Sequence, residues 1–263
     1  MMELLWAALL GFVEGITEFL PVSSTGHLIV VGHLLGFTGP KAETFEVAIQ
    51  LGAIAAVVVL YWPLFWGLVR PSGRRRFAGV RGMLLLFLTT LPACVLGLLL
   101  HSTIKGLFFP LSVAAALAAG AVVMLAVESR APRVRVWDVD AVSARDALWV
   151  GFWQCLALWP GFSRSAATIM GGMMLGFSRK VAAEYSFLAA VPVMVAATGY
   201  DLWKSREFLS LADLPLFGVG FVVAFVSACV AIRVFLHVVG STSFRPFALY
   251  RLVVAAVVWG VWR

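Results

Sequence analysis

The sequence predicts an all-α polytopic membrane protein with an inverted-topology repeat, each half made of a re-entrant helical hairpin and three transmembrane helices. Three observations predict this fold class. Of the 263 residues, 62% are apolar and only 13% are charged, whereas soluble domains carry about 25% charged residues. Mean hydropathy is +0.99. The chain also contains 24 glycines and 11 prolines, which indicates broken helices, and these survive at membrane depth only against protein or a wet cavity.

Six segments are long and apolar enough to cross a bilayer, which takes about 20 residues per helix. They are residues 47–69, 83–100, 107–127, 185–203, 214–239 and 246–262. Two further apolar regions, residues 4–36 and 147–177, are interrupted by polar turns that contain a proline. We expect each of these two regions to form two half-length helices that enter and leave the membrane on the same side.

Arginine positions predict the orientation, because cytoplasmic loops are enriched in Lys and Arg. Two loops that lie two spans apart are rich in arginine, whereas the loop between them carries Lys105 alone. Both arginine-rich loops should face the cytoplasm, so the two broken regions should enter from opposite faces. The arginines are Arg70, Arg74, Arg75, Arg76 and Arg81 in one loop, and Arg130, Arg133, Arg135 and Arg145 in the other.

Weak internal similarity at offsets of 138 to 140 residues supports an inverted repeat. We therefore expect a single integral membrane domain over residues 1–263, with one repeat over about 1–127 and a second over about 147–263. Glu46 and Glu184 should then open equivalent helices. The matches are Gly11-Phe12-Val13-Glu14 with Gly151-Phe152-Trp153-Gln154, Pro21 and Ser24 with Pro160 and Ser163, and Glu46 with Glu184.

Two carboxylates lie in the first broken region, where a charged group is expensive. Glu14 and Glu18 are four residues apart, so on a helix they project from one face. Such a pair must share a proton, face water or bind a cation. A helix end that reaches the headgroups is one interpretation; we favour a divalent cation site, for Mg²⁺ or Ca²⁺, combined with acid–base chemistry.

Hydroxyl groups and an imidazole follow these carboxylates after the proline that ends the helix. Ser23, Ser24, Thr25 and His27 together with a carboxylate provide the parts of an activated nucleophile. Serine and threonine at such a position are also common helix caps. Because Glu14, Glu18 and His27 lie close by in the sequence, we favour the catalytic interpretation.

The second broken region supplies the opposite charge. Arg164 is flanked by Ser163 and Ser165 at an expected helix start, where free N–H groups favour an anion. A guanidinium fork binds two phosphate oxygens at once, so this turn is predicted to bind phosphate. A structural pairing of Arg164 with Glu14 or Glu18 is compatible with that role.

Two further arginines, Arg233 and Arg251, lie near span ends and are expected to extend to the headgroups.

The three motifs together resemble a known family. Residues 14–27, EGITEFLPVSSTGH, residues 45–52, FEVAIQLG, and residues 160–165, PGFSRS, are similar to bacterial undecaprenyl-diphosphate phosphatases of the bacitracin-resistance family. The resemblance covers nearly the whole chain. It implies hydrolysis of the lipid carrier diphosphate to the monophosphate and inorganic phosphate in the bacterial inner membrane, which recycles the carrier for cell-wall synthesis. One departure is Ala166, where the family usually has glycine.

The resemblance also implies roles for the site residues and a divalent cation. Glu14 and Glu18 would hold the cation, and one of them would act as base for an attack by Ser24 or by water. Arg164 would stabilise the developing charge, and His27 would orient the nucleophile or protonate the leaving phosphate. The expected catalytic residues are Glu18, Ser24, His27 and Arg164, and the expected phosphate contacts are Ser163, Arg164, Ser165 and Thr25.

A secondary transporter or a polyprenyl-phosphate flippase is the rival class, because inverted repeats with broken helices are typical of transporters. The hairpin chemistry favours the enzyme, since binding alone does not require a carboxylate, a hydroxyl, an imidazole and an arginine. The expected partners are a polyprenyl diphosphate substrate and membrane lipids, and no nucleic acid, since the net charge of +7 comes from basic residues between apolar runs. The oligomeric state is left open, a homodimer included.

Overall fold

The computed structural model describes residues 2–71, 73, 75–205 and 211–263, so Arg74 lies outside the described residues. Over these ranges the chain is helical, and its sole β contact is a bridge between Val136 and Phe177. The helices are α1 (Met2–Thr17), α2 (Ser24–Leu35), α3 (Pro40–Leu60), α4 (Trp62–Val69), α5 (Gly79–Leu99), α6 (His101–Gly106), α7 (Pro110–Arg130), α8 (Ala144–Gln154), α9 (Arg164–Met174), α10 (Arg179–Ser205), α11 (Leu214–Val239) and α12 (Arg245–Trp262).

Six of the described helices are long and apolar enough to span a membrane, and they correspond to the six predicted spans: α3, α5, α7, α10, α11 and α12. The first prediction, residues 47–69, is misplaced. Helix α3 starts earlier, at Pro40, because proline fits the first helical position. It ends before Tyr61, and α4 follows with Pro63 in its first turn. If α3 continued through Pro63, the proline would remove a helical hydrogen bond and clash with the carbonyl group four residues earlier.

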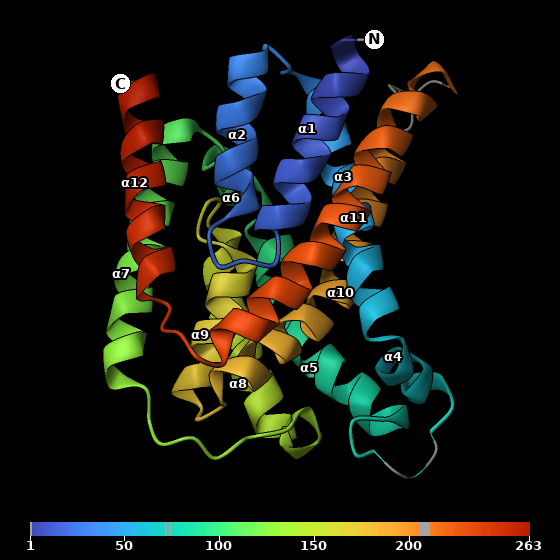
Figure 1. Cartoon of the computed structure of the whole chain (residues 1–263), viewed down its shortest axis with the longest axis vertical. Helices are drawn as coiled ribbons and strands as arrows, with labels where there is room; N and C mark the ends of the chain where they lie inside the picture. Colours follow the sequence, from blue (N-terminus) through green and yellow to red (C-terminus); the bar gives the residue numbers. More distant parts are fainter. Residues whose placement is uncertain (1, 72, 74, 206–210) are drawn as a thin grey trace.

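Both broken regions form two short helices, as predicted. Helices α1 and α2 are joined by residues 18–23, and α8 and α9 are joined by a 3₁₀ turn, Cys155–Leu158, and a short loop. Figure 1 shows the α1–α2 connection near the middle height of the molecule, below the N-terminus, whereas α8 starts near the opposite end. The two hairpins therefore enter from opposite ends and meet at mid-height.

Small residues allow α1 to lie directly against α11. A Cβ atom on Gly15 would stand 2.0 Å from the Ser227 hydroxyl oxygen, and one on Gly11 would stand 2.4 Å from the Gly220 carbonyl oxygen. Close helix approach through small residues is the usual packing mode in membranes. This contact fixes α1 in the interior, where the Glu14 side chain is fully buried.

The helices of the two predicted repeats pack among each other. Helices α3 and α10, α5 and α8, and α7 and α12 are in contact, in addition to α11 with both α1 and α3. The two broken hairpins are therefore enclosed by helices from both halves. The division into two repeats over the predicted ranges stays a prediction.

Candidate active site

The second helix of each hairpin begins after a serine with an unusual backbone. Ser23 has φ 72° and Ser163 has φ 76°, although residues other than glycine rarely adopt positive φ. Each serine hydroxyl accepts a hydrogen bond from a backbone N–H three residues on, at 3.4 Å from Gly26 and 3.2 Å from Ala166. Ser23 is thus the structural counterpart of Ser163, one residue away from the predicted pairing with Ser24.

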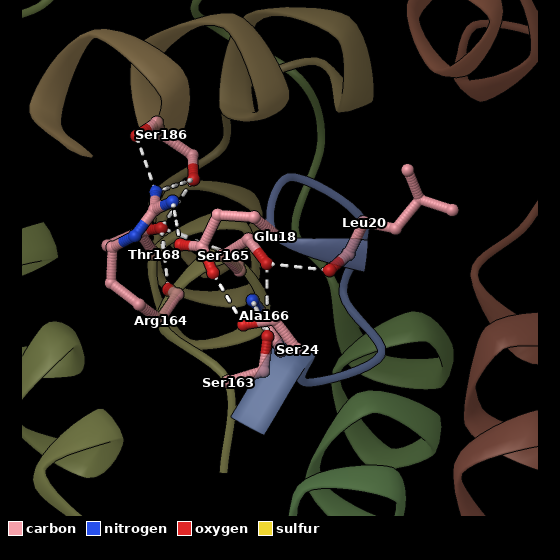
Figure 2. A network of polar contacts seen from close by, with 9 residues as sticks. All are labelled: Glu18, Leu20, Ser24, Ser163, Arg164, Ser165, Ala166, Thr168 and Ser186. Carbon is pink, nitrogen blue, oxygen red and sulfur yellow. Dashed lines mark hydrogen bonds and ion pairs between the residues drawn. The ribbon is translucent and has the colours of Figure 1, made fainter. Parts of the chain in front are cut away.

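The tips of the two hairpins meet at the Glu18 carboxylate (Figure 2). Ser24, the first residue of α2, donates its hydroxyl proton to Glu18 Oε2 across 2.5 Å. Arg164, the first residue of α9, donates from Nη2 to Glu18 Oε1 across 3.0 Å. All three side chains are largely buried. The acidic and basic motifs, 146 residues apart, therefore form one polar centre, as the sequence analysis expects.

Helix α10 holds the Arg164 guanidinium on its other side. Nη1 donates to the Ser186 carbonyl oxygen at 3.0 Å, and the Ser186 hydroxyl in turn bonds the Thr168 hydroxyl at 2.7 Å. The Phe19 ring lies 5.6 Å from the guanidinium carbon. Among the described residues, Arg164 Nε has no hydrogen-bond partner, so one fixed N–H remains for a ligand. No sequence pattern indicates a role for Ser186, since a lone serine in a span is unremarkable.

The other predicted phosphate contacts divide into two groups. The Ser165 hydroxyl donates to the Leu20 carbonyl oxygen at 2.8 Å and lies 3.0 Å from the Ser163 hydroxyl. It therefore joins the two hairpin tips. Thr25, half-buried at the start of α2, forms no side-chain hydrogen bond within the described part of the chain, so its hydroxyl is available to a ligand.

Glu14 is a buried carboxylate without a hydrogen-bond partner. It is 0% exposed, and within the described ranges neither carboxylate oxygen is hydrogen bonded. Its electrostatic neighbours are Glu18, Glu46 and Arg164. A bare buried carboxylate is costly, and a bound cation would lower this cost.

Glu46 lies in the second turn of α3 and Glu184 in the second turn of α10, so the expectation that they open their helices is wrong.

The residues present fit a cation site in which waters and substrate phosphates complete the coordination. No group of three or more His, Cys, Asp and Glu side chains that could hold a metal is found among the described residues, which disfavours a cage made by protein alone. Mg²⁺ often binds through one or two carboxylates together with waters and substrate phosphates. Glu14 and Glu18 suit that arrangement.

His27 points to α12 instead of to the nucleophile. Its Nδ1 lies 2.7 Å from the Ser23 carbonyl oxygen and its Nε2 lies 2.7 Å from the Tyr250 hydroxyl. A carbonyl oxygen only accepts, so Nδ1 carries a proton and the neutral ring accepts from Tyr250 at Nε2. No hydrogen bond joins His27 to Ser24 or Glu18 in the structure. Its catalytic role stays a prediction.

Arg251 is fully buried, at 0% exposed, so the expectation that it reaches the headgroups is wrong. Its burial is compensated by backbone dipoles, since no ion pair engages it among the described residues. Arg233, in contrast, is exposed, and its extension to the headgroups stays a prediction. The Arg251 guanidinium donates across 2.8–3.4 Å to the carbonyl oxygens of Pro21, Ala116, Leu117, Gly161 and Phe162.

Comparison with known proteins shows the family of this chain. The family described as Bacitracin resistance protein BacA matches residues 7–257. The chain belongs to the BacA family. With its six candidate spanning helices, it is a multi-pass membrane protein.

Curated relatives match over nearly their whole length. A protein of Nitratidesulfovibrio vulgaris (strain DP4) is 65% identical over 260 residues, which cover 98% of each chain. One from Maridesulfovibrio salexigens is 60% identical over 263 residues and 100% of each chain, and one from Lawsonia intracellularis is 56% identical over 253 residues and 95% of each. All three relatives are named undecaprenyl-diphosphatase.

An apolar groove of about 630 Å³ lies beside the polar centre of this BacA-family chain. Its walls come from α1, from α11 and from the start of α12, and Ser227 is the one polar residue in the lining that the structure describes. Leu20 connects the two regions: its carbonyl oxygen accepts from Ser165, whereas its side chain lines the groove and points away from the polar network (Figure 2).

Proposed function

We propose that the chain is an undecaprenyl-diphosphatase of the bacterial inner membrane, which hydrolyses undecaprenyl diphosphate to undecaprenyl phosphate and inorganic phosphate. Family membership and the names of its relatives support this activity. The observation that carries the proposal is the Glu18 carboxylate, which accepts a hydrogen bond from the Ser24 hydroxyl and forms an ion pair with Arg164. A base, a nucleophile and an anion-binding group therefore meet in one buried centre.

Ser24 is the nucleophile that this geometry favours over a direct attack by water. As the Ser24 oxygen bonds to the terminal phosphorus, its proton passes to Glu18, 2.5 Å away. The bond from that phosphorus to the bridging oxygen breaks, and undecaprenyl phosphate leaves with the bonding electrons. Water then hydrolyses the phosphoserine, which releases inorganic phosphate and restores the Ser24 hydroxyl.

Arg164 stabilises the charge that develops on the transferred phosphoryl group. Its Nε–H has no partner among the described residues, and Ser186 and Phe19 fix the direction of its fork. Preorganised donors of this kind act strongly in a site from which water is excluded. The Thr25 and Ser163 hydroxyls, at the starts of α2 and α9, would contact phosphate oxygens.

A divalent cation, Mg²⁺ or Ca²⁺, would be held by Glu14 and Glu18. When bound, it would neutralise charge on the diphosphate. The unpartnered oxygens of buried Glu14 support this proposal. His27 would act by holding the Ser23 turn, since its Nδ1–H donates to the Ser23 carbonyl oxygen.

The polyprenyl tail would lie along the apolar groove that begins at Leu20. Burial of each CH₂ is worth about 0.8 kcal/mol, so even the part of the tail inside the groove provides binding energy remote from the reacting phosphorus. The apolar lining, with Ser227 as its polar exception, suits a hydrocarbon chain.

A homodimer stays a proposal, and the mass of the detergent-solubilised particle tests it.

A phosphate-release assay on the purified chain in lipid nanodiscs tests the function. With undecaprenyl diphosphate, Ser24→Ala should lose activity by at least about a hundredfold, whereas the exposed Ser129→Ala serves as a matched control. Intact mass of the rapidly quenched wild-type enzyme should show one added phosphoryl group that Ser24→Ala lacks. Wild-type protein that releases no phosphate but moves polyprenyl phosphate between leaflets would contradict the proposal and support the flippase.

A further inference from the structure

A second cavity, of about 600 Å³, lies at the end of α9 opposite to Arg164. It opens between the connection that follows α7, the start of α8 and the end of α9. The arginine distribution assigns this face to the cytoplasm. One wall is basic, with Arg133, Arg135 and Arg145, and the other is apolar, with Trp149 and Met174.

The cavity carries uncompensated positive charge. Asp146 is the one acidic residue in the lining that the structure describes, and it forms an ion pair with Arg135. Arg133 and Arg145 are exposed and make no ion pair with any described residue. Two guanidinium groups are therefore free to bind an anion.

The walls of the cavity are fixed by backbone hydrogen bonds. The N–H groups of Arg135 and Val136 both donate to the Gly176 carbonyl oxygen, at 2.8 and 3.0 Å, and the Ser178 N–H donates to the Val136 carbonyl oxygen at 2.9 Å. Gly176 has φ 79°, and a Cβ there would lie 3.0 Å from Arg135 Cγ. A site that is ordered before its ligand arrives loses less entropy on binding.

We propose that this cavity binds the headgroup of an anionic phospholipid from the cytoplasmic leaflet. Guanidinium forks match phosphate oxygens, and basic pockets between membrane helices on this side bind such headgroups. The apolar wall decides between a lipid and a free anion, because Trp149 is 47% exposed and Met174 is 36% exposed beside the arginines. These side chains provide a surface for acyl chains, which inorganic phosphate does not need.

Fluorescence quenching at Trp149 tests the proposal at the site itself. The signal of Trp149 is the difference between the wild type and Trp149→Phe, each reconstituted in bilayers of brominated phosphatidylglycerol or brominated phosphatidylcholine. Quenching of the Trp149 signal should show that phosphatidylglycerol binds about tenfold or more tightly than phosphatidylcholine, since each basic residue strengthens anionic-lipid binding severalfold. Equal quenching by the two lipids would overturn the proposal.

Paired variants separate a site from general surface charge. Arg133→Gln with Arg145→Gln should abolish the lipid preference, whereas Arg75→Gln with Arg76→Gln, which removes the same charge from the other arginine-rich loop, should keep it. Equal losses in both pairs would refute a localised site, as would displacement of the lipid by excess inorganic phosphate. Thermal unfolding of each variant in the same bilayers verifies that the exposed replacements leave the fold intact.

Discussion

Replacement of Arg251 should disable catalysis although this side chain does not contact Glu18, Ser24 or Arg164. Its guanidinium donates to Pro21 in one hairpin tip and to Gly161 and Phe162 in the other. Arg251→Met keeps a long side chain but removes every one of these donors. The two tips then lose a shared anchor.

The size of the effect follows from the three turn carbonyls. A buried acceptor left without its donor costs about 1–3 kcal/mol, so three of them cost at least about 3 kcal/mol, partly offset because a buried charge is also removed. A shift of about 1 Å between Ser24 and Arg164 would lower turnover by about a hundredfold. Arg251→Lys keeps the charge, but one ammonium cannot span both tips, so its turnover should lie between those of wild type and Arg251→Met.

Phosphate release measured over a range of undecaprenyl diphosphate concentrations gives kcat and KM. We expect kcat to fall far more than KM rises, because Arg251 positions the site without touching substrate. Gly120→Ala is an independent test, since its Cβ would stand 2.1 Å from Arg251 Nη2 and should reproduce a milder loss of kcat. The exposed Arg233→Met is the matched control. Wild-type kcat in well-inserted Arg251→Met would refute the positioning role.

Three further outcomes test other parts of the molecule. Glu14→Gln should raise the Mg²⁺ concentration for half-maximal activity after chelation, whereas an unchanged Mg²⁺ titration would exclude Glu14 as a ligand. Val226→Trp should fill the groove and raise KM for undecaprenyl diphosphate but not for a short prenyl diphosphate, and parallel changes would contradict tail binding there. Burial opposes ionisation of Asp146, yet hydrogen bonds from Arg135 and Ser143 lower its pKa below the ordinary value. Its stabilisation is therefore complete above the unfolded-state pKa of about 4 and lost as pH falls through the folded-state pKa. The difference in thermal stability between wild type and Asp146→Asn should be present at neutral pH and shrink in acid, and a constant difference would show another origin.

Much of the fold could be predicted from the sequence because membranes impose simple rules. The length of the apolar segments indicates the spans, and polar turns that contain a proline indicate the two broken regions. The arginine positions indicate that these regions enter from opposite sides. The meeting of Glu18 with Arg164 followed from these constraints, since buried charges of opposite sign require partners. The start of α3 at Pro40 was missed because polar residues such as Lys41 and Glu43 precede its apolar part.

Other site features depend on contacts that no local pattern encodes. Arg251 and Arg233 look alike in sequence, each near the end of an apolar span, yet one is fully buried and the other exposed. The difference arises because carbonyl groups from two distant turns and from α7 surround Arg251. Tyr250 and Ser186 were missed for the same reason, as their partners lie 223 and 22 residues away along the chain.

The shared backbone of the two turns explains how the site is assembled. Ser23 and Ser163 adopt the same positive-φ cap, so Ser24 and Arg164 occupy equivalent first positions of α2 and α9. One position supplies a hydroxyl and the other a guanidinium, and both donate to Glu18. Either hairpin alone lacks one of the two donors, so the centre exists only when the tips are in register. Arg251 bonds to both tips, which accounts for a charge buried without a carboxylate. Three of its five acceptors are carbonyl groups of the two turns, which the close approach of the tips would otherwise leave without donors.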